Sequence, residues 1–599
     1  MPEQGTPQAD LSESIAEIAE RSQRLVTEFL SRQGGGANGG SGAGMPATPN
    51  HIGSAFLEMT AQMMSNPAKL AEAQMTLWKD YMTLWQSTAD RMMGKDGAPA
   101  IEPASDDRRF RDDAWSENDI FNFIKQSYLL SANWVQSTVR GVDGLDPKTA
   151  EKVDFYTRQL VNAMSPSNFA ATNPEVLRAT AASGGENLVN GLKNLLGDLE
   201  RGKGKLSISM TDYDAFEVGV NVATSPGKVI FRNELLELIQ YAPSTKKVCK
   251  TPLLIVTPWI NKYYILDLRP ENSLIKWAVD QGHTVFVTSW VNPDEKLADK
   301  NFADYMKQGI LESLDAMEQA TGEKSANVIG YCIGGTLLAA TLAWLQAKGE
   351  AKRIKSATFL TTMVDFSEPG ELGVFIDEEQ LTELEAKMNK RGYLEGSEMA
   401  NTFNMMRDND LIWSFVVNNY LLGKDPFPFD LLYWNADSTR MPAAMHSFYL
   451  RKMYLENRLI EAGGIEFDGT PIDVTTIKTP SYLLSTRDDH IAPWKSTYAA
   501  TNLFSGPTRF VLAASGHIAG VVNPPARDKY CHWTNDKTQK DPDKWLASAT
   551  QVEGSWWPDW QKWVGKYAGK KDIPARIPGD GKLTALEDAP GSYVKISSN

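Results

Sequence analysis

Cysteine is scarce in this chain, and its scarcity excludes a disulfide-stabilised protein. Only three cysteines, Cys249, Cys332 and Cys531, occur among 599 residues. So few thiols in so long a chain cannot form a disulfide framework, and they are typical of proteins of a reducing compartment. The sequence therefore predicts a protein of the cytoplasm.

Long hydrophobic runs and an excess of basic residues are also absent. No apolar stretch reaches the roughly 18 residues that a membrane-spanning helix needs, and the N-terminus lacks the basic start and apolar core of a secretory signal. The formal net charge is −14, whereas a surface that binds nucleic acid would be basic. We therefore expect a soluble protein with no nucleic-acid partner.

Apolar residues are plentiful, at 42% of the chain, and they suffice for more than one domain core. Residues 1–32 carry apolar side chains at helical spacing and predict an amphipathic helix. The glycine-rich residues 33–50 predict a flexible linker, and residues 51–213 predict a helical N-terminal domain. Within 54–93, a face rich in Met and Trp has two interpretations. It is either the core of a helix pair or a docking surface for a partner, a granule or a lipid layer.

Residues 214–599 have a different sequence pattern, because short runs rich in β-branched residues alternate there with longer amphipathic segments. The expected strands are 228–231, 253–257, 284–289, 326–330, 356–362, 481–485 and 509–513. Nearly continuous apolar strands are buried on both faces, so they predict a parallel sheet covered by helices. The long aromatic-rich connection between the fifth and sixth strands predicts a helical cap insertion, at about 365–455, over the carboxyl edge of the sheet.

The sequence GYCIGG at 330–335 follows one of these strands and leads into an Ala- and Leu-rich helix. It has the pattern of the G-x-S-x-G nucleophile elbow of α/β hydrolases, with Cys332 in place of serine. The sharp turn strains the nucleophile, and only glycines two residues before and after it leave room. The N-terminus of the following helix favours the thiolate. The motif alone is also compatible with a small buried cysteine that has no catalytic role. A catalytic cysteine needs an acid and a base elsewhere in the chain.

An acid and a base both occur in the expected chain order. Asp489 follows one later strand and His517, one of only six histidines, follows the next. We take Asp489 as the acid and His517 as the base, against the alternatives of a helix-capping carboxylate and an ordinary loop histidine. The neighbouring His490 is expected to be structural, and Asp488 is expected to face solvent.

Two backbone N–H groups are expected to complete the site. The oxyanion of a tetrahedral intermediate needs two donors, usually the residue after the nucleophile and one from the loop after the third strand. Here these are Ile333 and either Ile260 or Trp259, and we take Ile260 as the candidate.

Several motifs resemble those of one known family, the class I polyhydroxyalkanoate synthases. They are GYCIGGTLLA (330–339), RDDHIAPW (487–494), SGHIAGVVNPP (515–525), DRRFRDDAW (107–115) and SPSNFAATNPEVL (165–177). The resemblance spans both halves of the chain. It implies an α/β-hydrolase catalytic domain with a cap insertion, preceded by an all-helical domain.

The resemblance implies that the protein polymerises (R)-3-hydroxyacyl-CoA, with 3-hydroxybutyryl-CoA as the expected substrate, into polyester and releases CoA. It makes Cys332 the acyl-bearing thiol and His517 its general base. Asp489 either supports His517 or activates the substrate hydroxyl, and both roles stay open. No metal is expected, and no cofactor other than the CoA that is part of the substrate.

The same resemblance implies partners for this function, and two other functions remain as alternatives. The expected partners are the polymer granule surface, phasin-type granule proteins and a second copy of the chain, held through the cap. Cysteine suits a thioester substrate because thiolate attack exchanges one thioester for another at nearly equal energy. The alternative on the same fold is a thioesterase or polyester depolymerase, and a catalytically silent granule-coat protein is a rival of another class.

Overall fold

The computed structural model describes residues 17–18, 20–21, 23–24, 49–95 and 97–597. Its described residues form two compact units. The helical unit comprises residues up to Asp212 and Asn401–Phe427, and the α/β unit comprises Tyr213–Ala400 and Pro428–Asn599. No helix in the described part of the chain is long and apolar enough to span a membrane.

The helix expected over 1–32 and the linker expected over 33–50 fall almost entirely outside the described residues. The few described positions of the first segment are helical. Arg21, one of them, donates two hydrogen bonds to the Glu200 carboxylate, of 3.1 and 2.8 Å. This ion pair joins the start of the chain to the last long helix of the helical unit.

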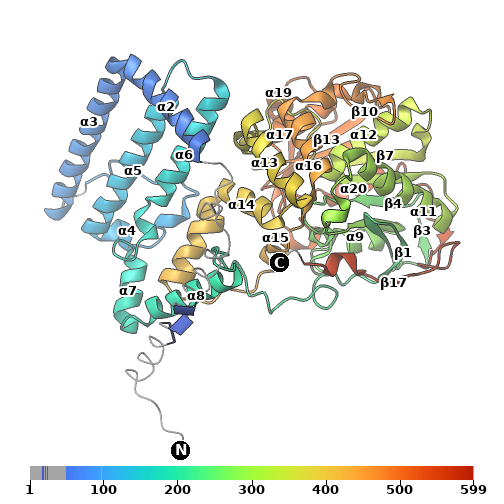
Figure 1. Cartoon of the computed structure of the whole chain (residues 1–599), viewed down its shortest axis with the longest axis horizontal. Coiled ribbons are helices and arrows are strands. Elements are labelled where there is room, and N and C mark those ends of the chain that lie inside the picture. The colour runs from blue at the N-terminus through green and yellow to red at the C-terminus, as the bar shows by residue number, and fades with distance from the viewer. Residues whose placement is uncertain (1–16, 19, 22, 25–48, 96, 598–599) are drawn as a thin grey trace, which may run out of the picture. The chain divides into compact units, whose positions relative to one another are not determined.

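The N-terminal part of the helical unit is built from helices drawn in blue to green in Figure 1. They are α2 (Pro49–Ser65), α3 (Pro67–Met92), α4 (Ala114–Glu117), α5 (Asp119–Arg140), α6 (Pro147–Ala163), α7 (Pro174–Ser183) and α8 (Glu186–Arg201). The stretch 54–93 forms parts of two helices because Asn66 caps α3 and Pro67 occupies its first turn. A small core of Ala55, Met59 and Val153 joins α2 to α6.

The insertion expected over 365–455 is divided between the two units. Its middle part, residues 401–427, belongs with the N-terminal helices, and the flanking parts belong to the α/β unit. Its helices are α13 (Glu378–Arg391), α14 (Gly396–Met406), α15 (Asp430–Ala436) and α16 (Ala443–Phe448). The expectation of one cap over the sheet edge therefore needs correction for residues 401–427.

Buried polar contacts hold residues 401–427 among the N-terminal helices. The Asn162 side-chain amide donates to both carboxylate oxygens of Asp408, at 3.0 and 3.1 Å. The Tyr420 hydroxyl donates to the Asp198 carboxylate at 2.5 Å. Amides and carboxylates that are buried need such partners, and losing one is costly. These contacts account for the assignment of this segment to the helical unit.

The α/β unit is built on an eleven-stranded sheet of order β15-β14-β13-β12-β7-β6-β4-β5-β2-β1-β17. Its strands are β1 (Gly227–Arg232), β2 (Leu236–Tyr241), β4 (Leu253–Val256), β5 (Val285–Trp290), β6 (Ala326–Tyr331), β7 (Ile354–Leu360), β12 (Ser481–Thr486), β13 (Thr508–Ala513), β14 (Cys531–Thr534), β15 (Thr550–Glu553) and β17 (Glu587–Asp588). The six strands from β13 to β5 in this order are parallel. All seven expected strands are present, and the α/β fold is confirmed.

The sheet is mixed, and the expectation of a purely parallel sheet was wrong at its edges. Strand β1 pairs antiparallel with β2, and β2 pairs antiparallel with β5. Only three residues, 233–235, separate β1 from β2, and so short a link allows only an antiparallel return. Strands β14 and β15 extend the other edge, also antiparallel.

The parallel strands are buried on both faces, as their apolar sequences predict. Leu254 and Val256 of β4 lie in one apolar core, and Leu253 and Ile255 lie in the other. The first core contains α11 (Glu312–Thr321), α12 (Ile333–Ala347), α17 (Trp494–Tyr498), α18 (Ala500–Leu503) and α19 (Pro542–Ala547), and the second contains α9 (Leu274–Asp280) and α20 (Trp557–Val564). Helices therefore cover the sheet on both sides (Figure 1).

Candidate active site

Cys332 lies at the sharp turn between β6 and α12. Its backbone has φ 52° and ψ −121°, a conformation that non-glycine residues rarely adopt. The Cys332 N–H donates to the Leu360 carbonyl at 2.9 Å, and its carbonyl accepts from Gly335 N–H at 2.9 Å. Strain of this kind persists only where the surroundings fix it, and it is typical of functional sites. The geometry is that of a nucleophile elbow.

The glycines around Cys332 are required by close contacts. A Cβ on Gly330 would lie 2.5 Å from the Gly335 Cα, and one on Gly334 would lie 2.5 Å from the Val256 carbonyl oxygen. A Cβ on Gly335 would lie 2.0 Å from the Thr362 Oγ1. The first two are the positions that the sequence pattern singled out, and Gly335 is a third, required by the close approach of Thr362.

Asp489 and His517 are joined by a short hydrogen bond. The His517 Nδ1 and the Asp489 Oδ2 are 2.7 Å apart, and the two side chains are 6% and 0% exposed. The Asp489 Oδ1 accepts from the N–H groups of Ile491 and Ala492, both at 2.9 Å. The Thr486 hydroxyl donates to Oδ2 at 3.1 Å. All the hydrogen bonds of this carboxylate therefore fix its orientation toward the imidazole.

The charges of Cys332, Asp489 and His517 act on one another. Burial raises the pKa of Asp489, but His517 and the backbone donors outweigh it, so this pKa lies below its usual range. Burial lowers the pKa of His517, but Asp489 and Cys332 outweigh it and the pKa is raised. A hydrogen bond between the side chains of His517 and Cys332 contributes to that increase. The structure thus brings all three predicted residues together.

The expected oxyanion donors belong to two elements of the α/β unit. Ile333 is the first residue of α12, and Ile260 follows β4, the strand next to β6. Within the described part of the chain, neither N–H donates a hydrogen bond. Both donors are thus available, and their role stays a prediction. Of the two neighbours of the acid, Asp488 is exposed and next to Arg487, as expected, and His490 is partly buried.

Comparison with known proteins gives the family. The model of the poly-beta-hydroxybutyrate polymerase (PhaC) N-terminus matches residues 106–278, and the α/β hydrolase fold model matches 266–524. The poly(3-hydroxyalkanoate) polymerase subunit PhaC of Rhizobium meliloti (strain 1021) is 51% identical over 89% of this chain and 87% of its own length. The chain belongs to the poly(3-hydroxyalkanoate) polymerase family.

Other members of the family match over nearly the full length. The polymerase of Methylorubrum extorquens is 51% identical over 93% of both chains, and the PhaC subunit of Cupriavidus necator is 45% identical over 95% of this chain and 94% of its own. A solved monoacylglycerol lipase from Paleococcus ferrophilus is 14% identical, with a TM-score of 0.30, over 47% of this chain and 90% of that chain. The family resemblance and the fold class expected from the motifs are confirmed.

Two residues of this polymerase that sequence reasoning missed are tyrosines of the insertion. Burial raises the pKa of both Tyr449 and Tyr454, and the charge of Cys332 adds to the increase. Both belong to the π-helical segment Tyr449–Leu455, which follows α16. A spacing of five residues falls on no face of an ordinary helix, so hydrophobic periodicity could not pair them. Their only signal in the sequence is the repeated aromatic in YLRKMYL.

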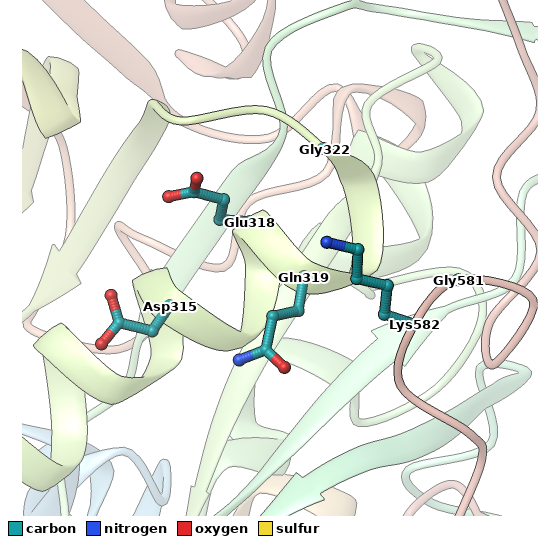
Figure 2. Close-up of a pocket in the computed structure, with 6 residues that line it drawn as sticks. All are labelled: Asp315, Glu318, Gln319, Gly322, Gly581 and Lys582. Atoms are coloured by element: carbon teal, nitrogen blue, oxygen red, sulfur yellow. The ribbon is translucent and has the colours of Figure 1, made fainter.

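The hollow drawn in Figure 2 is separate from this site. It has a volume of about 660 Å³ and is lined by Asp315, Glu318, Gln319, Gly322, Gly581 and Lys582. None of these residues belongs to the set of Cys332, Asp489 and His517. Within the described residues there is also no cluster of three His, Cys, Asp or Glu side chains that could hold a metal ion.

Proposed function

We propose that Cys332 carries the acyl group as a thioester, with His517 as its general base and Asp489 as the orienting acid. The chain polymerises 3-hydroxyacyl-CoA into polyester, as its family membership establishes. The observation that supports this cysteine mechanism is the strained Cys332 in hydrogen-bonding range of a His517 that is fixed by Asp489 at 2.7 Å. A thiolate beside a protonated imidazole is the reactive form of a catalytic cysteine.

In the first step, the Cys332 sulfur attacks the thioester carbonyl of the acyl-CoA. A Cys332–acyl bond forms, the bond from the carbonyl carbon to the CoA sulfur breaks, and the proton on His517 goes to the departing CoA thiolate. The N–H groups of Ile333 and Ile260 would hold the developing oxyanion. The acyl group keeps its thioester activation on the enzyme.

In the second step, the 3-hydroxyl of the next 3-hydroxyacyl-CoA attacks the Cys332 thioester. Its proton goes to His517, the new ester bond forms and the Cys332–acyl bond breaks. The lengthened chain, now on CoA, returns to Cys332 by the first step. Acylation removes the negative sulfur that helps to raise the pKa of His517, so the neutral imidazole is available as a base in this step.

An exposed apolar face of the helical unit supports a location at the surface of the polymer. The face of α2 and α3 leaves large apolar side chains exposed, including Trp78 at 67% and Trp85 at 61%. Exposed apolar patches of this kind are typical of interaction sites. We propose that this face contacts the hydrophobic polymer granule, that phasin-type proteins share the granule, and that the chain acts there as a homodimer. Trp78→Ser with Trp85→Ser should weaken retention on polymer granules in a sedimentation assay, without loss of CoA release.

The cysteine mechanism is tested with 3-hydroxybutyryl-CoA by following released thiol together with turbidity. Cys332→Ala should abolish both signals, whereas Cys531→Ala, which removes a partly exposed cysteine of β14, should leave both unchanged. Mass spectrometry of the quenched enzyme should find the acyl group on Cys332. Thiol release without polymer would instead indicate a thioesterase, and polymer formation by Cys332→Ala would refute the proposed nucleophile.

A further inference from the structure

The residue before Cys332 contacts the proposed base. Tyr331 is the last residue of β6 and is 1% exposed. Its hydroxyl donates a hydrogen bond to the backbone carbonyl of His517 at 3.2 Å. Its ring also stacks on the imidazole of His517, with the ring centroids 5.8 Å apart and an interplanar angle of 25°. One side chain next to Cys332 therefore contacts both the backbone and the ring of His517.

These contacts join two strands that are not neighbours. Cys332 follows β6 and His517 follows β13, and β7 and β12 lie between them in the sheet. Adjacent strands are about 4.8 Å apart, so β6 and β13, three spacings apart, are separated by about 14 Å. The segment after β13 must therefore turn back across two strands to bring the imidazole toward the sulfur.

Two tryptophans of the last long helix hold the same segment a few residues further on. The Trp556 indole N–H donates to the Gly520 carbonyl at 3.0 Å. The Trp557 indole N–H donates to the Val521 carbonyl at 3.0 Å. These bonds fix the backbone three and four residues beyond His517. The bond from the tyrosine hydroxyl adds a fixed point at His517 itself.

Asp489 and Tyr331 act on different parts of His517. Asp489 bonds to the ring nitrogen Nδ1 and so fixes the direction in which the imidazole faces. Tyr331 bonds to the backbone from which the ring projects. Because Tyr331 precedes Cys332 in the chain, this bond ties the base to the strand that carries the nucleophile. Such positioning matters, since a misplacement of about 1 Å can slow a reaction about a hundredfold.

We propose that Tyr331 is a positioning residue, which fixes His517 relative to the turn that carries Cys332. Its hydroxyl holds the His517 carbonyl, and its ring supports one face of the imidazole. This inference rests on the cysteine mechanism proposed above. Tyr331 takes no part in bond making, because the attacking atom belongs to Cys332 and the proton moves on His517.

Tyr331→Phe tests this role, because it keeps the stacked ring and removes the hydroxyl. The kcat for CoA release from 3-hydroxybutyryl-CoA should fall about tenfold, the loss typical of one hydrogen bond. KM should stay within twofold of the wild type, because the change alters the geometry of proton transfer.

Alkylation of Cys332 by iodoacetamide is the second measurement, followed on the Cys332 peptide by mass spectrometry. At pH 6 the thiolate depends on the nearby imidazolium, so alkylation of Tyr331→Phe should be about fivefold slower than that of the wild type. At pH 9 a free thiol ionises without help, so the two rates should agree.

Tyr482→Phe is the matched control. Tyr482 is 0% exposed in the same core as Tyr331, and its hydroxyl donates to the Asp559 carboxylate at 3.0 Å. It also loses a buried hydrogen bond, so it should lower the melting temperature but change neither kcat nor alkylation at pH 6. Equal losses of kcat in the two variants would overturn the proposal. Wild-type kcat and alkylation in Tyr331→Phe would do the same.

Cys332→Ala separates this inference from the proposed mechanism. The substrate is butyryl-CoA, which can acylate the enzyme but lacks the 3-hydroxyl needed for elongation. If Cys332→Ala still releases CoA, the cysteine mechanism fails, and the role of Tyr331 fails with it. If Cys332→Ala is inactive and Tyr331→Phe behaves as the wild type, only the positioning role is wrong.

Discussion

Replacing Asp489 by asparagine should reverse the tautomer of the catalytic imidazole. The side-chain oxygen of the asparagine would keep the two bonds from the N–H groups of Ile491 and Ala492, both 2.9 Å in the wild type. The amide nitrogen would then replace Oδ2, which now lies 2.7 Å from the His517 Nδ1. Because an amide nitrogen only donates, Nδ1 would have to accept, and the ring proton would move to the nitrogen that faces Cys332.

The size of the effect follows from what is lost. A charge-assisted hydrogen bond contributes about 1.5–3 kcal/mol, and in Ser-His-Asp enzymes the same substitution lowers kcat by about 10⁴. A thiol depends less on its base than a hydroxyl does. We therefore expect Asp489→Asn to slow acylation from butyryl-CoA about a thousandfold. Since Asp489 raises the pKa of His517, the basic limb of the pH–rate profile should also move to lower pH.

The assay is single-turnover CoA release at a series of pH values, with Asp488→Asn as the matched control on the adjacent exposed carboxylate. The control should retain the wild-type rate and profile. If Asp489→Asn acylates at the wild-type rate and loses only elongation, Asp489 acts on the substrate hydroxyl and the orienting role is wrong. An unchanged basic limb would refute the electrostatic part of the reasoning.

Three further changes test the surroundings of the site and the packing within the helical unit. Gly335→Ala should destabilise the α/β unit by about 1–3 kcal/mol in denaturant unfolding, because the new Cβ would lie 2.0 Å from the Thr362 Oγ1; unchanged stability would contradict the contact. His446 is 2% exposed and burial lowers its pKa to about 4, so wild-type stability should fall as the pH drops below about 6.5. His446→Leu should raise the melting temperature more at pH 5 than at pH 8, and an equal shift at both would count against burial as the cause. Asp408→Ala removes the carboxylate that accepts two hydrogen bonds from Asn162, so limited proteolysis within 401–427 should be faster. Cleavage at the wild-type rate would show that this pair does not hold the segment.

The residues of the candidate site could be predicted from the sequence because their signals are local. The glycines around Cys332 are imposed by contacts within one turn, such as that between Gly330 and Gly335. Asp489 and His517 follow apolar strands in a fixed order, and parallel strands bring their carboxyl ends to one edge of the sheet. Each of these predictions uses only a short motif and the order of the strands along the chain.

The rest depends on contacts between distant segments. Nothing in GKVIFR tells a parallel strand from an antiparallel edge strand, because the direction of β1 is set by the short link to β2. The edge strand β15 was not expected either, since all four of its residues are exposed and carry no apolar pattern. The π-helical segment Tyr449–Leu455 was not expected either, because its spacing matches no ordinary helical periodicity.

The division of the insertion has a consequence for how members of this family can be recombined or shortened. A protein that begins after Asp212 would keep residues 401–427 but lose Asn162 and Asp198, the side chains that satisfy Asp408 and Tyr420. Residues 401–427 of such a protein would need new hydrogen-bond partners. The same segment of a second copy of the chain could supply them. In a chimera of two relatives, residues 401–427 and the N-terminal helices should therefore come from the same relative, and the sheet can come from the other.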